Sequence, residues 1–421
     1  MKRFSTRLIV SVALVAGCSS PEGGDGPDVA TGGSVATGSG GTSGSGGAST
    51  SGGSPSSGGN DSSATGGAQE TASGGAVSGG ADGADGAGGD TGTGGAQGIE
   101  GPCDIYEAGG TPCVAAHSTV RALYGSYAGK LYQVRRSSDN TTQDISVVSA
   151  GSYADGVAQE TFCTGTLCVI SIIYDQSPKG NHLTRAPKGG WLDKANGGTE
   201  ADATKAKITL NGHPVYGVYT TGSFDDLVGG VGYRNNETSG VAVADEPETI
   251  YMVASGKHFN QWCCFDYGNA ETNNLDNGPA TMETAYFGSS TQWGRGSGTG
   301  PWVMADLEDG VFAGGSFDAP ESNTSLIADY VTVMVKGHSG DRFGLKGGDA
   351  QSGLLSTKYD GKRPNGYSPQ KKEGAIVLGI GGDNSHTGEG TFFEGCMTAG
   401  VASDEVDAAI QANIVAAGYG K

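Results

Sequence analysis

The region from residue 101 to residue 421 is predicted to form an all-β domain, a β-sandwich or jelly roll with long loops. Three runs rich in β-branched residues predict strands: Val169–Tyr174, Val331–Val335 and Ala375–Ile380. Clusters of Gly, Asn, Asp and Ser between such runs predict turns. Helical periodicity is confined to a short stretch near 118–125 and a final one over 403–417, where Ser403 is a candidate N-cap. Long loops at one edge of such a sandwich favour a binding cleft.

The N-terminus has the features of an export signal. Basic residues precede an apolar run, Leu8–Val15, which is too short to span a membrane but has the length of a signal-peptide core. Small residues then lead to Cys18, as at the cleavage site of bacterial lipoproteins. We therefore predict a signal peptide over 1–17 and lipidation of Cys18. An ordinary secretory signal with an incidental cysteine is the alternative.

Residues 18–100 are predicted to be a disordered linker. Gly, Ser, Thr and Ala dominate this segment, and it contains no aromatic residue. Such a composition buries too little apolar surface to offset the entropy lost on ordering. As a flexible coil of about 80 residues it would span on the order of 50 Å, and we interpret it as a spacer.

Charge and composition exclude one class of partner. The chain carries 45 acidic and 25 basic residues, with a formal net charge of −20, so no basic patch indicates nucleic-acid binding. A neutral saccharide is a compatible partner. Residues 101–421 are long enough for one large domain or two small, tightly joined ones.

The eight cysteines indicate disulfides rather than a metal site. Besides Cys18 they form three close pairs and one single residue: Cys103 with Cys113, Cys163 with Cys168, Cys263 with Cys264, and Cys396. In an exported protein close pairs favour local disulfides, and Cys396 is expected to be a buried free thiol. The six histidines form no HxH or HxxxH pattern, so neither a metal nor a cofactor is expected.

Adjacent Cys263 and Cys264 are unusual. A disulfide between neighbours closes an eight-membered ring and forces the peptide between them out of ordinary geometry, and strained backbone is concentrated at functional sites. A rigid, apolar sulfur wall is suited to packing against the face of a sugar. Two free buried cysteines are the alternative interpretation.

Two segments present candidate catalytic carboxylates. If residues 302–308 form a strand, alternate side chains point to opposite faces. One face then carries Trp302, Met304, Asp306 and Glu308. The other face, toward the core, carries Val303, Ala305 and Leu307. The solvated face of a sheet would give the same pattern. In the second segment, Gly379–Ser385, an apolar strand runs into a Gly-Gly turn that presents Asp383, although Asp is also common in plain turns.

A pair of carboxyl groups is what glycoside hydrolysis requires. One protonates the leaving oxygen, while the other attacks the sugar or activates water. The acid must keep its proton near neutral pH, which burial or a neighbouring carboxylate favours. No GxSxG nucleophile motif competes, and no P-loop follows the glycines near Asp383.

Five segments occur in an order and spacing that match a known family: Gly101–Gly109, Ile173–Ser177, Cys263–Glu271, Glu373–Ile376 and Gly379–Ser385. Through them, nearly all of 101–419 resembles the catalytic domain of glycoside hydrolase family 54, the α-L-arabinofuranosidases of fungal type. The resemblance implies a concanavalin-like β-sandwich. It also implies retention of anomeric configuration through a covalent arabinosyl-enzyme. The expected substrates are arabinoxylan, arabinan or their fragments, from hemicellulose or pectin.

The resemblance also implies roles for individual residues. Glu308 matches the nucleophile and Asp383 the general acid/base. Asp306, Gly382, Trp293 and the vicinal disulfide Cys263–Cys264 match sugar-contacting positions, and the other two cysteine pairs match the family's remaining disulfides. Asp309 and Gly310 stand where the family commonly has two sugar-contacting asparagines, so contacts at these substrate-binding positions are expected to differ.

Two functions of different classes are compatible with these residues. The first is exo-acting removal of terminal α-L-arabinofuranosyl groups, with galactofuranosides or xylosides as related substrates. The second is a non-catalytic, sugar-binding surface lipoprotein on the same fold. The presence of both Glu308 and Asp383 favours the enzyme. The family often carries a C-terminal arabinose-binding β-trefoil, which we do not expect here. The protein is expected at the cell surface or outer membrane, held only by the N-terminal lipid, or else secreted.

Overall fold

The computed structural model describes residues 100–191, 197–225 and 228–421. The predicted signal peptide, Cys18 and nearly all of the predicted linker lie outside these residues. No helix within the described ranges has the length and hydrophobicity needed to cross a lipid bilayer.

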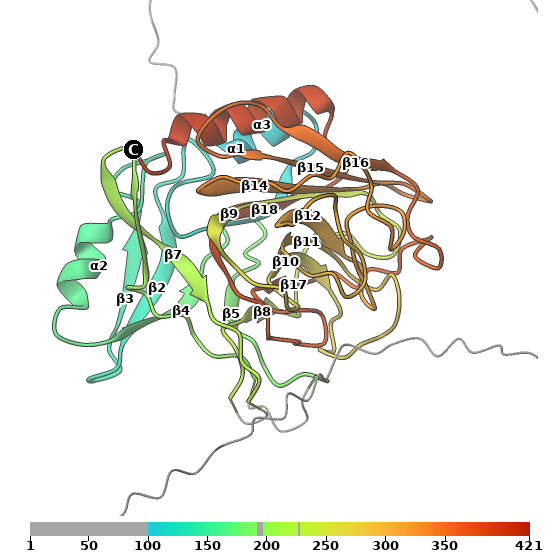
Figure 1. The fold of residues 1–421 in the computed structure, drawn as a ribbon. Helices are drawn as coiled ribbons and strands as arrows, with labels where there is room; N and C mark the ends of the chain where they lie inside the picture. Colours follow the sequence, from blue (N-terminus) through green and yellow to red (C-terminus); the bar gives the residue numbers. More distant parts are fainter. Residues whose placement is uncertain (1–99, 192–196, 226–227) are drawn as a thin grey trace, which may run out of the picture. The chain divides into compact units, whose positions relative to one another are not determined.

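The described residues form two antiparallel sheets packed face to face, which confirms the predicted all-β sandwich (Figure 1). One sheet runs in the order β16 (Ser356–Gly361), β15 (Phe343–Asp349), β14 (Tyr330–Gly337), β9 (Glu248–Phe259), β18 (Gly390–Thr398), β7 (His213–Thr220) and β6 (Ala206–Leu210), with β1 (Cys113–Ser118) paired to β18. The other runs β13 (Val311–Phe312), β12 (Trp302–Asp306), β11 (Glu283–Gly288), β10 (Asp266–Ala270), β17 (Ala375–Leu378), β8 (Tyr233–Asn235), β5 (Leu183–Arg185), β4 (Cys168–Ile173), β2 (Lys130–Arg136) and β3 (Thr142–Ser146).

The three predicted strands are confirmed, with one shorter than expected. The run 169–174 corresponds to β4, and 331–335 lies within β14. The third, predicted over 375–380, ends as β17 at Leu378, because Gly379 takes a φ of 80° and turns the chain. Shortening this strand leaves 379–385 free to form the loop that carries Asp383.

Helix α3 (Asp404–Ala417) covers the outer face of the first sheet, beside α1 (Pro102–Ala108) (Figure 1). Ser403 caps α3 by accepting a hydrogen bond from the Val406 N–H, as predicted. Lys336 of β14 forms an ion pair with Asp407 of α3, and both side chains are buried. This cover explains why β14 is buried on both faces.

The short helix predicted over 118–125 is wrong. This segment begins at the end of β1 and continues as irregular chain. The N–H groups of Val120 and Arg121 donate to the Ser118 hydroxyl. Two further N–H groups bond outside the segment: that of Ala122 donates to the Ser152 carbonyl and that of Leu123 to the Gln176 side chain. These tertiary bonds replace the i to i−4 ladder of a helix. A further helix, α2 (Gly156–Phe162), had no clear sequence signal.

Candidate active site

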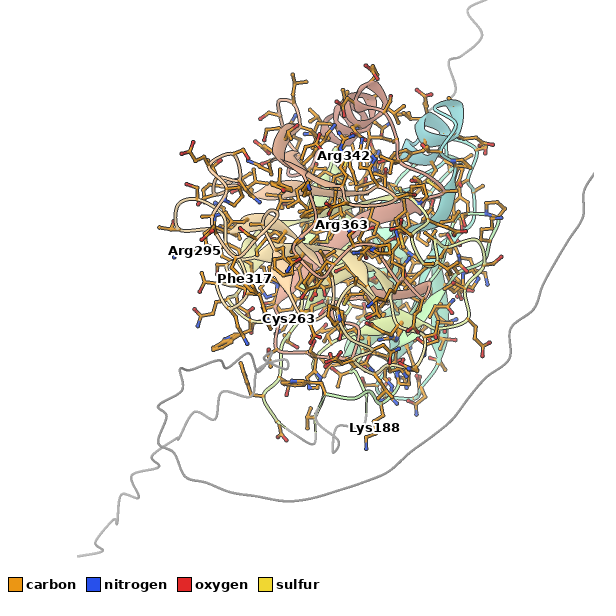
Figure 2. All side chains as sticks on the ribbon, turned by 90° about the vertical axis from the view of Figure 1, so that its right-hand side faces the viewer. Lys188, Cys263, Arg295, Phe317, Arg342 and Arg363 are labelled. Carbon is orange, nitrogen blue, oxygen red and sulfur yellow. A yellow bond between two sulfur atoms is a disulfide. The ribbon has the colours of Figure 1, made fainter. Side chains whose placement is uncertain are left out.

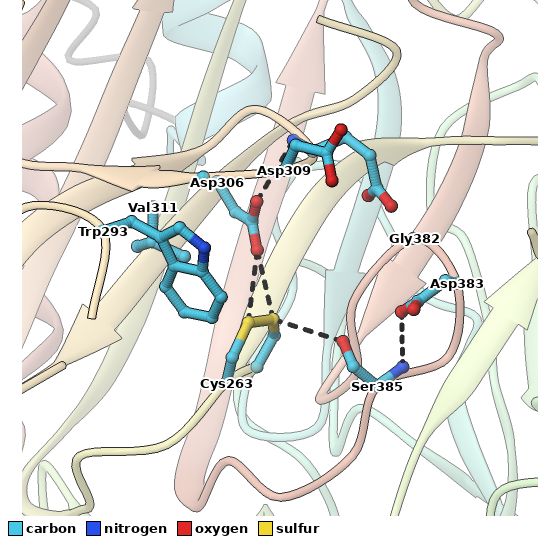
Figure 3. A pocket seen from close by; sticks show the side chains of 11 residues that line it. Cys263, Trp293, Asp306, Asp309, Val311, Gly382, Asp383 and Ser385 are labelled. Atoms are coloured by element: carbon cyan, nitrogen blue, oxygen red, sulfur yellow. Dashed lines mark hydrogen bonds between the residues drawn. A yellow bond between two sulfur atoms is a disulfide. The ribbon is translucent and has the colours of Figure 1, made fainter. Parts of the chain in front are cut away.

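A small pocket with about 250 Å³ of open space lies over the second sheet (Figure 3). Its walls come from segments next to adjacent strands: the loop before β10, the loop after β11, the end of β12 and the loop after β17. The structure places every predicted catalytic and substrate-binding residue in it. The lining residues are Cys263, Cys264, Trp293, Asp306, Glu308, Asp309, Gly310, Val311, Gly382, Asp383 and Ser385.

The alternation predicted for strand β12 is confirmed up to Asp306. Val303 and Ala305 pack in the main core between the sheets. Trp302 and Met304 instead join a second apolar cluster, on the face that carries the pocket, together with Trp293 and the two adjacent cysteines. The solvated-face alternative is wrong, since all five residues of β12 are buried.

Glu308 does not continue the strand, which corrects the prediction for 302–308. Strand β12 ends at Asp306, and Glu308 and Asp309 adopt left-handed φ angles of 61° and 55°. The turn is closed by the Leu307 N–H, which donates to the Gly310 carbonyl at 3.0 Å. Such conformations cost free energy in non-glycine residues and are concentrated at functional sites. The turn, rather than the pleat of a strand, brings Glu308 to the pocket.

Phe312 and Tyr367 fix the backbone at Asp309 and Gly310. A Cβ atom at Gly310 would lie 2.5 Å or less from the Phe312 ring and 2.9 Å from the Tyr367 hydroxyl. That hydroxyl donates a 2.8 Å hydrogen bond to the Asp309 carbonyl. The backbone of the turn is therefore fixed at a position where no larger residue fits.

Asp383 is presented by a compact loop. Its Oδ1 accepts a 2.8 Å hydrogen bond from the Ser385 N–H, and the Gly381 N–H donates to the Ser385 carbonyl at 2.9 Å. Arg234 of β8 donates to the Gly382 carbonyl at 2.6 Å and to Asn384 Oδ1 at 2.8 Å. These bonds fix the backbone on both sides of Asp383.

A vicinal disulfide forms one wall of the pocket. Cys263 and Cys264 are bonded to each other, and Asp306 Oδ2 lies 3.5 Å and 3.1 Å from their sulfur atoms (Figure 3). Disulfide sulfurs carry no hydrogen, so these are close contacts between the carboxylate and an apolar wall. Trp293 and Asp383 lie on opposite sides of the disulfide in this view. Figure 2 shows Cys263 on the face that also carries Arg295 and Phe317.

The other cysteines follow the sequence pairing. Cys103 is bonded to Cys113 and Cys163 to Cys168, with Cα–Cα distances of 5.6 Å and 5.8 Å. Cys396 is a buried free cysteine close to the first of these pairs. Because the cysteines near Cys396 and those near Asp306 are joined in disulfides, they offer no thiolate to a metal.

The electrostatics of the pocket are dominated by buried carboxyl groups. Burial raises the pKa of Glu308 well above its usual range, and the charges of Glu271, Asp383 and Asp306 raise it further. Burial also raises the pKa of Asp383, and it raises that of Asp306 to about 7. Protonated carboxyls at neutral pH are what general-acid chemistry requires.

Sequence reasoning missed two residues of the site, Arg234 and Glu271. Arg234 is 2% exposed, and burial lowers its pKa to about 10 against the opposing effect of Glu271, Glu308 and Asp383. Glu271 lay within a segment that carried the family resemblance, but no role was predicted for it. Neither residue stands out in the sequence, because Arg234 lies within the short polar strand β8 and Glu271 follows β10, which is not an apolar run.

Comparison with known proteins decides the family. Residues 102–420 match the model of the family described as α-L-arabinofuranosidase B, catalytic. The chain belongs to this family.

Curated relatives and solved structures agree with that assignment. The probable α-L-arabinofuranosidase B of Aspergillus fumigatus is 54% identical over 325 residues, covering 76% of this chain and 63% of the relative. The α-L-arabinofuranosidase B of Emericella nidulans is 54% identical over 324 residues, covering 76% and 62%. The chain thus spans less than two thirds of the length of these relatives.

Two solved structures have the same fold at 52% identity. One is a mutant of a glycoside hydrolase family 54 α-L-arabinofuranosidase soaked with 4-nitrophenyl α-L-arabinofuranoside, with a TM-score of 0.73 over 76% of this chain and 66% of that one. The other is an arabinofuranosidase complexed with arabinofuranosyl-α-1,2-xylobiose, with a TM-score of 0.72 over 76% and 65%.

Proposed function

We propose that this family member is a retaining, exo-acting α-L-arabinofuranosidase. It releases terminal α-L-arabinofuranosyl groups from arabinoxylan, arabinan or the oligosaccharides derived from them. The observation that supports this most strongly is the pocket in which Glu308, Asp383 and the Cys263–Cys264 disulfide meet. Glycoside hydrolysis needs two carboxyl groups at one sugar, and both are present there.

Glu308 is the proposed nucleophile and Asp383 the proposed acid/base. Glu308 attacks the anomeric carbon while Asp383 protonates the departing oxygen, which leaves an arabinosyl ester on Glu308. Asp383, now a carboxylate, takes a proton from the water that hydrolyses this ester. Burial raises the pKa of Asp383, which keeps it protonated for the first step.

The rest of the pocket is proposed to select the sugar. The pocket is small and walled by four separate segments, which favours one furanose at a chain end over an extended polymer. Asp306 accepts a hydrogen bond from a sugar hydroxyl, and the disulfide and Trp293 contact the apolar ring face. Asp309, Gly310 and Gly382 supply the remaining contacts. The relative solved with arabinofuranosyl-α-1,2-xylobiose supports arabinoxylan fragments as substrates.

We also propose that the protein is exported and anchored by lipid at Cys18. The apolar run before Cys18 and the Gly/Ser-rich segment after it support this arrangement. Radioactive palmitate fed to the expressing bacterium would label the wild-type protein and fail to label Cys18→Ala. Equal labelling of both would contradict the anchor, and an unlabelled but secreted wild type would indicate an ordinary signal peptide.

A panel of p-nitrophenyl glycosides tests the activity. Wild-type protein should release p-nitrophenol from the α-L-arabinofuranoside far faster than from the β-D-galactofuranoside or β-D-xyloside. Glu308→Gln should lose at least about 1,000-fold in kcat, because the covalent step is removed. Titration calorimetry tests the non-catalytic alternative by measuring binding of arabinosyl oligosaccharides. A wild-type protein that binds these oligosaccharides but never cleaves them would support a sugar-binding protein instead of an enzyme.

A further inference from the structure

The carboxyl group of Glu271 lies beside that of Glu308. Glu271 directly follows strand β10, and its side chain is fully buried (0% exposed). A Cβ atom at Gly382 would overlap Glu271 Oε2 and would lie 2.6 Å from Glu308 Oε2. Both carboxylate oxygens therefore face the same backbone position, on the side of the pocket that carries the Asp383 loop.

The two oxygens of Glu271 have different surroundings. Oε1 accepts a 2.5 Å hydrogen bond from the Thr281 hydroxyl. Oε2 is buried, and no N–H or O–H group of the described residues donates to it. A buried carboxylate oxygen without a donor is costly. A proton shared with the neighbouring Glu308 carboxyl would supply the missing hydrogen bond.

The charges around this pair oppose its double ionisation. Burial raises the pKa of Glu271 to about 7, and burial followed by the charge of Glu271 raises that of Glu308. Arg234 is the cation that faces the pair, and it is already bonded to backbone carbonyls and Asn384. The other charged groups with the largest effects on Glu308 or on Arg234 are acidic: Asp276, Asp306, Asp383 and Glu373.

We propose that Glu271 is a positioning residue that shares one proton with Glu308 and holds that proton while Glu308 attacks the anomeric carbon. The proposal rests on the assignment of Glu308 as nucleophile. Glu271 itself makes no bond to the substrate. It keeps Glu308 ionised and oriented in a pocket where burial would otherwise keep Glu308 neutral.

The proton balance of the first step follows directly. The bond between Glu308 and the anomeric carbon forms as the bond from that carbon to the leaving oxygen breaks. The leaving oxygen takes the proton of Asp383, and the shared proton passes fully to Glu271. When water releases the sugar, the proton is again shared between Glu271 and the freed Glu308 carboxylate.

One shared proton predicts two pH limits. At low pH both carboxyls are protonated and no nucleophile is available. At high pH both are ionised, so Glu308 loses its hydrogen bond and is repelled by Glu271. In the wild-type enzyme the deprotonation of Asp383 also lowers activity at high pH. The two causes separate in an Asp383→Asn background, where a p-nitrophenyl leaving group needs little acid assistance.

The first test is the pH profile of kcat/KM for p-nitrophenyl α-L-arabinofuranoside. Asp383→Asn should keep an alkaline fall, whereas Asp383→Asn/Glu271→Gln should lose it, because the amide donates to Glu308 at every pH. At the optimum Glu271→Gln should lower kcat/KM by less than tenfold, whereas Glu271→Ala should lower it roughly 10- to 100-fold. The control Glu373→Gln, in the same background, should keep the fall. An alkaline fall that persists in Asp383→Asn/Glu271→Gln, or that is missing from Asp383→Asn, would overturn the proposal.

The second test requires no turnover and so separates this proposal from the proposed activity. Protein labelled with ¹³C at the glutamate side-chain carboxyls is titrated by NMR. Glu271 and Glu308 should titrate as a coupled pair with two well-separated apparent pKa values. In Glu308→Gln, Glu271 should titrate in a single step, and in Glu271→Gln so should Glu308. Signals that titrate independently, unaffected by removal of the partner, would contradict a shared proton whether or not the protein is an enzyme.

Discussion

Arg234 Nη1 donates a hydrogen bond of 2.6 Å to the carbonyl oxygen of Gly382, the residue that precedes Asp383. The same guanidinium also bonds Asn384 Oδ1 and the Glu271 carbonyl. One buried cation on β8 thus connects the loop of the proposed acid/base with the end of β10, which carries the partner of the proposed nucleophile. Arg234 thus fixes the backbone next to Asp383 relative to the backbone of Glu271.

Arg234→Gln should therefore damage both stability and activity. It removes several buried hydrogen bonds, at a cost of about 3 kcal/mol in the free energy of unfolding. The looser Asp383 loop should lower kcat more than it raises KM. Arg342→Gln is the matched control, since it breaks an exposed, solvent-screened ion pair with Asp360 and should leave the free energy of unfolding nearly unchanged. Chemical denaturation and steady-state kinetics measure both effects, and equal behaviour of the two variants would contradict the connecting role of Arg234.

Gly382→Ala tests the close packing of the carboxyl pair. The added methyl group would overlap Glu271 Oε2 and contact Glu308 Oε2, so it should displace both carboxyls and lower kcat/KM by at least about 100-fold. Gly344→Ala in β15 is the control, because its Cβ would meet its nearest atom at an ordinary 3.5 Å. Kinetics on the aryl arabinofuranoside compare the two. Near-wild-type activity of Gly382→Ala would mean that the carboxyl groups of Glu271 and Glu308 do not pack against Gly382 in solution.

Two double variants distinguish the proposed sugar contact of the Cys263–Cys264 disulfide from the stabilising effect of a disulfide outside the pocket. The double variant Cys263→Ala/Cys264→Ala should raise KM about tenfold, a loss of about 1.4 kcal/mol of sugar binding. The double variant Cys163→Ala/Cys168→Ala should lower thermal stability and leave KM unchanged, because that disulfide does not line the pocket. An unchanged KM in the first variant would show that the Cys263–Cys264 disulfide does not contribute to sugar binding.

Asp306→Asn tests the cost of holding an acid in the pocket. The pKa of Asp306 is raised by burial to about 7 in the folded protein, against about 4 in an unfolded chain. Between these pH values the folded state binds the extra proton, so this group costs stability increasingly as the pH rises from about 4 to about 7. The asparagine variant should be more stable than wild type at pH 8, with the difference shrinking toward pH 4. A variant equally destabilised at both pH values would contradict the raised pKa.

Local pattern was sufficient to predict much of the sandwich and the two carboxylate segments. The β-branched runs and the Ser403 cap are local signals, and the structure confirms both. The helix expected over 118–125 does not form, because the N–H groups of Ala122 and Leu123 donate to distant segments and those of Val120 and Arg121 donate to the Ser118 side chain. The turn at Glu308 was missed because a glutamate gives no sequence signal for a left-handed φ angle.

The supporting residues of the site could not be predicted for a related reason. Arg234 and Glu271 lie behind the lining residues of the pocket only because β8, β17, β10, β11 and β12 are neighbours in one sheet. The pairing of these strands joins segments far apart in the chain, and local periodicity does not encode it. The family resemblance supplied Glu308 and Asp383, but the structure was needed to identify what holds them.

The most direct test of the central claim is the mass of the acid/base variant Asp383→Asn during turnover of p-nitrophenyl α-L-arabinofuranoside. The good leaving group allows the first step, while the missing base slows release of the sugar. The protein should gain the mass of one arabinosyl group, and peptide mapping should place that group on Glu308. An unmodified protein that still releases p-nitrophenol with a burst, or an arabinosyl group on another residue, would contradict the account.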